Sequence, residues 1–236
     1  MRAMILAAGR GERMRPLTDH TPKPLLSVGG KPLIQWHIER LVNSGIVDIV
    51  INHAWLGEKI EAALGDGRAL GAHLHYSAES IALETAGGIA NALPLLGDQP
   101  FLVINGDVWC DWPIDTAQSH AHQMQALGCT AWLLLVDNPP HHPEGDFYLS
   151  TSTHVMLEGS SSQQKKLTFA GVGIYSPSLF QALPRQQPAP LAPLLRKAMS
   201  DHHVIGTHYN GRWVDVGTPQ RLADLDQRIY QQYAAT

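Results

Sequence analysis

The sequence of 236 residues contains little cysteine, few charged residues and no long apolar run. Cys110 and Cys129 are its two cysteines; they are too few for a disulfide framework and lack CxxC spacing, so we expect reduced, buried thiols in a cytoplasmic protein. No apolar run reaches the roughly 18 residues of a membrane span. Charged residues make up 16% of the chain, 17 basic against 21 acidic, which excludes the strongly basic surface that binds nucleic acid. We therefore expect a soluble protein with neither nucleic-acid nor membrane partners.

What the chain does contain is an alternation of short β-rich apolar runs with stretches of helical periodicity. This alternation is typical of an α/β protein with a mostly parallel sheet. We expect strands at 4–8, 47–52, 72–77, 101–104, 130–136, 166–175, 204–208 and 212–216, and helices at 33–42, 55–64, 85–93, 113–127, 191–199 and 218–233. Thr85 and Thr218 are the expected N-caps of two of these helices.

The domain organisation is expected to be simple. The chain has no internal repeat and no linker, which predicts a single domain over 1–236 with a small loop or hairpin insertion around 137–168. Within that insertion, 158–164 is rich in serine and glutamine and is expected to be a hairpin tip or a disordered loop.

Polar segments follow the first four expected strands, at 9–23, 52–53, 77–84 and 105–107. In an open α/β sheet, ligands bind beyond the carboxyl ends of the strands. The sequence therefore predicts a binding cleft at this edge of the sheet.

The first of these segments points to phosphate. Gly-Arg-Gly-Glu-Arg-Met-Arg-Pro at 9–16 combines glycines, which let backbone N–H groups approach an anion, with arginines, which present a fork of donors. It is neither a dinucleotide fingerprint, because Met14 stands at the third glycine position, nor a P-loop. A surface turn with solvated arginines is the alternative. Lys23 lies between two prolines, which predicts a stiff, extended segment that aims its charge, although a plain surface lysine is also compatible.

Together these segments resemble the sugar-1-phosphate nucleotidyltransferases. The likeness spans nearly the whole chain and rests on Leu-Ala-Ala-Gly-Arg-Gly-Glu-Arg-Met-Arg-Pro at 6–16, Pro-Lys-Pro at 22–24, Glu-Thr-Ala-Gly-Gly at 84–88, Asn-Gly-Asp at 105–107 and Asp-Val-Gly-Thr-Pro at 215–219. More narrowly, Asn-His-Ala-Trp-Leu-Gly at 52–57 and Gly-Asp-Phe at 145–147 resemble the N-acetylmuramate α-1-phosphate uridylyltransferases of peptidoglycan recycling. The resemblance implies a three-layer α/β/α, Rossmann-like (GT-A-like) sandwich.

The resemblance also implies a reaction. The phosphate oxygen of N-acetylmuramate 1-phosphate would attack the α-phosphorus of UTP, releasing pyrophosphate, with Mg²⁺ as cofactor. Arg13 would hold the β- and γ-phosphates, and Lys23 would lie between the UTP α-phosphate and the attacking phosphate. Asp107 and Asp215 would share the magnesium ion, so that these four residues are the implied catalytic set.

Further contacts follow from the same resemblance. The implied nucleotide-binding residues are Leu6, Ala8, Gly9, Gly11, Glu12, Arg13, Lys23, Glu79 and Thr85, and the implied sugar-binding residues are Asn105 and Asp146. Related thymidylyltransferases carry glutamine in place of Glu79, whose carboxylate accepts from uracil N3–H but does not donate to O4. Asp146 is also compatible with simply ending the proline-rich loop. Lys165 and Lys166 are either solvated or within reach of the sugar phosphate.

Several alternatives remain at this point. The same chemistry on glucose 1-phosphate or mannose 1-phosphate, by a uridylyl- or guanylyltransferase, is the nearest, although the Glu-Lys-Pro triplet of glucose-1-phosphate enzymes is absent. An inactive homologue that senses nucleotide sugars is expected to have lost one of the four catalytic residues. A nicotinamide-dependent oxidoreductase needs a third glycine and an acidic residue where Asn52 stands. We assign the 13 histidines to the surface rather than to the metal, because magnesium prefers oxygen ligands, and we expect a monomer.

Overall fold

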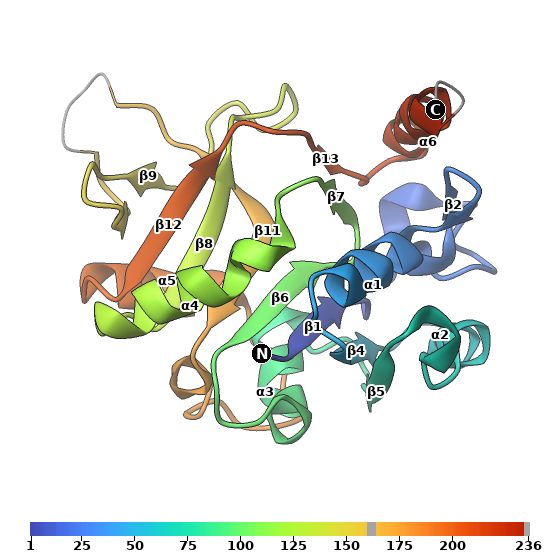
Figure 1. Ribbon diagram of the computed structural model, residues 1–236, viewed down its shortest axis with the longest axis horizontal. Helices are drawn as coiled ribbons and strands as arrows, with labels where there is room; N and C mark the ends of the chain where they lie inside the picture. The colour runs from blue at the N-terminus through green and yellow to red at the C-terminus, as the bar shows by residue number, and fades with distance from the viewer. Residues whose placement is uncertain (160–163, 234–236) are drawn as a thin grey trace.

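The protein is built around a seven-stranded sheet of order β12-β8-β11-β6-β1-β4-β5 (Figure 1). The computed structural model describes residues 1–159 and 164–233, with side chains as far as residue 231. The strands of the sheet are β1 (Ala3–Leu6), β4 (Asp48–His53), β5 (His73–Ala78), β6 (Phe101–Asn105), β8 (Ala131–Val136), β11 (Thr168–Tyr175) and β12 (Val204–Tyr209). Neighbouring strands are parallel except that β11 runs antiparallel to both β6 and β8, so the predicted mostly parallel sheet is confirmed.

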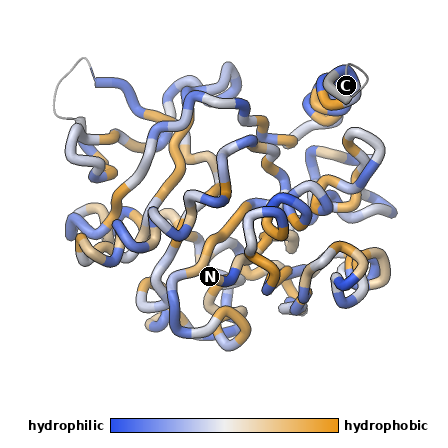
Figure 2. Tube along the Cα trace, in the orientation of Figure 1, coloured by the Kyte–Doolittle hydropathy of each residue, from blue (hydrophilic) through white to orange (hydrophobic). Residues whose placement is uncertain are grey.

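Helices cover both faces of this sheet. α1 (Leu33–Asn43), α2 (Gly57–Leu64) and α4 (Ala117–Ala126) pack on one face, and α3 (Glu84–Leu96) and α5 (Leu191–Ser200) pack on the other (Figure 1). Successive strand residues face opposite layers: Ile5 of β1 lies in one core cluster with Ile34 of α1, and Met4 lies in the other with Ile89 of α3. Figure 2 shows the apolar residues concentrated along these strands. The three-layer α/β/α arrangement is therefore confirmed.

Smaller elements frame the sheet. They are β2 (Ser27–Val28) paired with β3 (Lys31–Pro32), β7 (Val108–Cys110) paired with β13 (Trp213–Asp215), and β9 (Tyr148–Leu149) paired with β10 (Val155–Met156). The last helix, α6 (Pro219–Tyr233), packs against β2 through Val28, Leu225 and Ile229. The segment 158–164 is expected to be a hairpin tip or a disordered loop. Residues 160–163 of it lie outside the described residues.

The ends of two predicted elements shift for local reasons. β1 ends at Leu6 because the Ala7 N–H donates to the side chain of Asn52 (2.9 Å) instead of continuing the strand ladder. The helix expected from residue 55 begins at Gly57, because Leu56 has a left-handed φ of 51°.

Of the two predicted N-caps, one is confirmed and one is wrong. The Thr218 hydroxyl accepts from the Arg221 N–H at 3.3 Å, at the start of α6. Thr85 is not a cap: α3 begins one residue earlier, and no side chain caps it.

Two further expectations are tested by burial. Both cysteines are free and buried, as predicted. His37 and His53 are also buried, so the assignment of histidines to the surface is wrong for these two. Across the described part of the chain, no helix combines the length and the apolar character needed to cross a bilayer.

Candidate active site

A cavity of about 370 Å³ lies at the carboxyl ends of β1 and β6, where the polar strand ends were predicted to meet. It is lined by Leu6, Ala7, Ala8, Gly9, Gly11, Glu12, Arg13, Met14, Lys23, Pro24, Asn52, Ala82, Glu84, Thr85, Asn105, Gly106, Asp107 and Gly217. Every predicted nucleotide-binding residue except Glu79 is in this lining, and so is Asn105 of the predicted sugar-binding pair. Asp215 and Asp146 are not, although Asp215 lies two residues before Gly217.

The loop after β1 leaves one of its three arginines for a ligand. Arg10 and Arg15 both pair with Asp19, at 3.5 and 2.7 Å. Arg13 is exposed, lines the cavity and makes no hydrogen bond or ion pair within residues 1–159 and 164–231. Its Nη2 atom lies 3.2 Å from where a Cβ on Gly217 would stand. Arg13 is thus an unpaired cation at the rim of the cavity.

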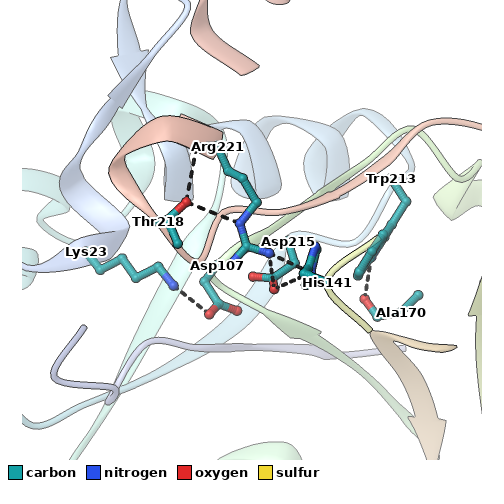
Figure 3. Close-up of polar contacts among 8 residues, drawn as sticks. All are labelled: Lys23, Asp107, His141, Ala170, Trp213, Asp215, Thr218 and Arg221. Atoms are coloured by element: carbon teal, nitrogen blue, oxygen red, sulfur yellow. Dashed lines mark hydrogen bonds and ion pairs between the residues drawn. The ribbon is translucent and has the colours of Figure 1, made fainter. Parts of the chain in front are cut away.

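Lys23 is a buried cation, so the alternative of a plain surface lysine is wrong. It is 8% exposed, and its Nζ donates to Oδ2 of Asp107 at 2.7 Å (Figure 3). Pro22 is extended as predicted, but Lys23–Leu25 forms a 3₁₀ turn rather than extended chain. This turn places Lys23 in the lining of the cavity.

Asp107 and Asp215 are brought together by the short strands β7 and β13. These strands pair antiparallel with Asp215 opposite Val108, and the Val216 N–H donates to the Asp107 carbonyl oxygen at 2.8 Å. Figure 3 shows the two carboxylates side by side, with Lys23 on the far side of Asp107. The structure therefore places the predicted pair of carboxylates at one point.

Two residues that the sequence interpretation missed contact Asp215. Its Oδ2 atom accepts from Nη1 of Arg221 at 2.9 Å and lies 3.3 Å from Nε2 of His141 (Figure 3). Arg221 Nη1 also lies 2.6 Å from that His141 nitrogen, which accepts because a guanidinium has only donors. Arg221 therefore ties the loop before β9 to the carboxylate.

The donor set at this point suits magnesium only together with a ligand. Mg²⁺ is commonly held by one or two carboxylates plus substrate phosphates and waters, and Asp107 and Asp215 supply the carboxylates. Within the described ranges, no cluster of three or more His, Cys, Asp or Glu side chains is arranged to hold a metal by itself. A divalent cation here thus needs phosphate oxygens to complete its coordination.

Glu79 lies behind the cavity lining. Its Oε1 accepts from Nδ2 of Asn52 (2.7 Å) and its Oε2 accepts from the Leu83 N–H (2.8 Å). Burial raises the pKa of Glu79, and these two hydrogen bonds oppose the rise. Both carboxylate oxygens of Glu79 thus hold the turn before α3. Thr85, the second residue of α3, lines the cavity.

The two predicted sugar-binding residues, Asn105 and Asp146, have different surroundings. Asn105 is accommodated by Gly171, where an added Cβ would lie 2.7 Å from its Nδ2 atom. Asp146 accepts from the Phe169 N–H at 2.8 Å and lies 3.1 Å from His142, so it anchors the start of β11. Asn105 faces the cavity, whereas Asp146 does not reach it.

Lys165 and Lys166, the two lysines considered for the sugar phosphate, lie just before the start of β11. Lys165 is exposed, and the Lys166 amine lies 5.7 Å from the ring centre of Tyr148. Neither is part of the cavity lining.

The chain is similar to known proteins over nearly its whole length. A protein-family profile described as nucleotidyl transferase matches residues 2–232. An N-acetylmuramate alpha-1-phosphate uridylyltransferase of Neisseria meningitidis is 55% identical over 95% of this chain and 96% of its own length. One of the same name from Caulobacter vibrioides is 33% identical over 96% of each chain. A putative glucose-1-phosphate thymidylyltransferase from Bacillus anthracis superposes with a TM-score of 0.83 at 21% identity, over 98% of this chain and 95% of that one, which shows the shared fold.

Proposed function

The chain belongs to the nucleotidyl transferase family, and on this premise we propose that it transfers UMP from UTP to N-acetyl-α-muramate 1-phosphate. The products are UDP-N-acetylmuramate and pyrophosphate. The 55% identity to a relative named for this activity supports the choice of acceptor. The observation that carries the chemistry is the meeting of Lys23, Asp107 and Asp215 at one end of the cavity that Arg13 lines.

The triphosphate end of UTP meets the loop after β1. Gly11 has a left-handed φ of 70°, which turns the chain so that the residues after it border the cavity. Arg13 has no partner among residues 1–159 and 164–231, so its guanidinium is free to hold the β- and γ-phosphates and to stabilise departing pyrophosphate. Leu6, Ala8, Gly9 and Thr85 form the apolar and backbone surface for the nucleoside.

The reacting phosphates both carry negative charge, and Lys23 offsets the repulsion between them. Because the Lys23 side chain is buried, its amine is already positioned. The side chain therefore needs little rearrangement to contact the α-phosphate and the attacking phosphate together. Asp107 and Asp215 would hold Mg²⁺, which supplies charge neutralisation on the phosphates when bound. Asn105 contacts the sugar, and Asp146 supports that side by anchoring β11.

Purified protein tests the proposal directly. It is incubated with Mg²⁺, UTP and each of N-acetylmuramate, glucose and mannose 1-phosphates, and with GTP in place of UTP, while pyrophosphate release is recorded. Fastest release with N-acetylmuramate 1-phosphate and UTP supports it. A preference for glucose or mannose 1-phosphate overturns the acceptor, and nucleotide binding without release favours the sensing homologue. Analytical ultracentrifugation tests the monomer, which stays a prediction together with the cytoplasmic location and the single domain.

A further inference from the structure

Residues 54–56 connect β4 to α2 and take no part in the chemistry above, yet Trp55 among them contacts the loop after β1. Trp55 is a large apolar residue that is 36% exposed. Its indole Nε1 donates to the Thr18 carbonyl oxygen at 3.1 Å, and the Arg10 guanidinium stacks 3.7 Å from its ring centre. Trp55 therefore serves the neighbouring loop rather than the core.

Thr18 passes this contact on to the turn at Gly11. The Thr18 side chain is fully buried, and its hydroxyl donates to the Gly11 carbonyl oxygen at 2.8 Å. Its methyl carbon lies 3.0 Å from where a Cβ on Gly11 would stand, so the two residues are in close contact. Two hydrogen bonds thus connect Trp55 with the turn that lies two residues before Arg13.

At the Trp55 end of this connection, the chain is fixed by the junction between β4 and α2. Leu56 holds a left-handed φ of 51°, a conformation that a leucine rarely adopts unless its surroundings impose it. A Cβ on Gly57 would lie 1.9 Å from Nδ1 of His53, and the other ring nitrogen of that histidine lies 2.7 Å from Glu61 of α2. Trp55 therefore extends from a rigid junction between β4 and α2.

We infer that Trp55 and Thr18 are positioning residues that hold the loop in the form in which Gly11 and Arg13 meet a triphosphate. The inference rests on the proposed function, because it takes UTP as the ligand of this loop. A loop that is already ordered loses less conformational entropy when it binds its ligand. Without the connection, that entropy cost falls on nucleotide binding, while the acceptor side of the cavity is unaffected.

The test compares Thr18→Val, Thr18→Ser and Trp55→Leu with the wild type. Isothermal titration with UTP measures Kd, and steady-state kinetics measure KM for the sugar phosphate. We expect Thr18→Val and Trp55→Leu to weaken UTP binding about tenfold, because each removes one hydrogen bond of the connection. Thr18→Ser keeps the hydroxyl and is expected to stay within about twofold of the wild type. The KM for the sugar phosphate is expected to be unchanged in all three.

Tyr230→Leu is the matched control, since it removes an aromatic side chain that is 70% exposed on α6 and distant from the loop in sequence. An unchanged Kd for UTP in Thr18→Val and Trp55→Leu overturns the inference. So does a Thr18→Ser variant as weak as Thr18→Val, or an equal loss for both substrates, because either result indicates a general structural role. Wild-type protein that binds UTP but releases no pyrophosphate contradicts the proposed function alone, and wild-type protein that does not bind UTP contradicts both.

Discussion

At the scale of single residues, each of the two neighbouring carboxylates has its own cation. Asp107 pairs with Lys23 and Asp215 pairs with Arg221. In the proposed reaction, a triphosphate that approaches Lys23 would compete with Asp107 for the same amine and would leave the Asp107 oxygens to a divalent cation. On that proposal, Asp107 would link the charge of the nucleotide to the charge of the metal.

Asp107→Asn keeps the shape of this side chain and removes its charge. We expect turnover to fall at least about 100-fold at saturating Mg²⁺, because a metal ligand and a counter-ion are lost together. Asp111→Asn is the control, since Asp111 directly follows β7, as Asp107 directly precedes it, and pairs with Arg212 at 2.9 Å but does not line the cavity. Initial rates of pyrophosphate release measure both variants, and normal turnover of the Asp107 variant would refute the metal assignment.

The site residues that could be predicted from the sequence are those whose neighbours in the sequence form a recognisable pattern. Lys23 is flanked by prolines, and Asp107 follows a buried strand at the edge where ligands bind. Arg221 could also have been predicted from the sequence, because it lies in the first turn of α6, the helix that begins at the end of the motif containing Asp215. His141 was not, since its contact with Asp215 depends on the path of an irregular loop.

At the scale of elements, the site depends on the pairing of β7 with β13. Each strand is three residues long, too short for an alternating pattern to reveal which strand it pairs with. The pairing nevertheless decides that Asp215 stands beside Asp107. It also brings the residue after Val216 to a point where three segments of the chain meet.

That residue is Gly217, and the substitution Gly217→Ala tests whether the close approach of Arg13, Asp215 and Arg221 at this point matters for activity. An added Cβ would lie 2.3 Å from Arg221 Nη2, 2.9 Å from Asp215 Oδ1 and 3.2 Å from Arg13 Nη2. Because the backbone of Gly217 is not left-handed, alanine strains the functional side chains rather than the chain itself. We expect kcat/KM to fall at least about tenfold, while the free energy of unfolding changes by about 1 kcal/mol or less. Unchanged kinetics, measured beside urea unfolding curves, would contradict this convergence.

At the scale of the whole molecule, the layered fold was predictable and its strand order was not. Alternating apolar runs and helical stretches predict a sheet between two helical layers, because each element must bury one face. The antiparallel insertion of β11 between β6 and β8 arises from long-range pairing. This insertion places Gly171 beside Asn105, a contact that could not be predicted from the sequence.

The helical layer also places a titratable group in the core beneath the site. His37 of α1 is 2% exposed, and its Nε2 atom has no hydrogen-bond partner in the described part of the chain. Burial, aided by the charge of Arg40, lowers the pKa of His37 from 6.5 to about 4. The folded protein thus keeps this ring neutral at pH values where the unfolded chain protonates it.

The unfolded state therefore binds more protons between about pH 6.5 and pH 4, and stability falls as the pH falls through that window. Between pH 7 and pH 5 this single group is expected to remove about 2 kcal/mol from the free energy of unfolding. His37→Leu deletes the titration and should flatten that part of the pH profile, measured by urea unfolding at each pH in the presence of EDTA. His75→Leu, on the exposed side of β5, is the matched control and should keep the wild-type slope. Equal slopes in wild type and His37→Leu would show that the acid sensitivity of the fold comes from other groups.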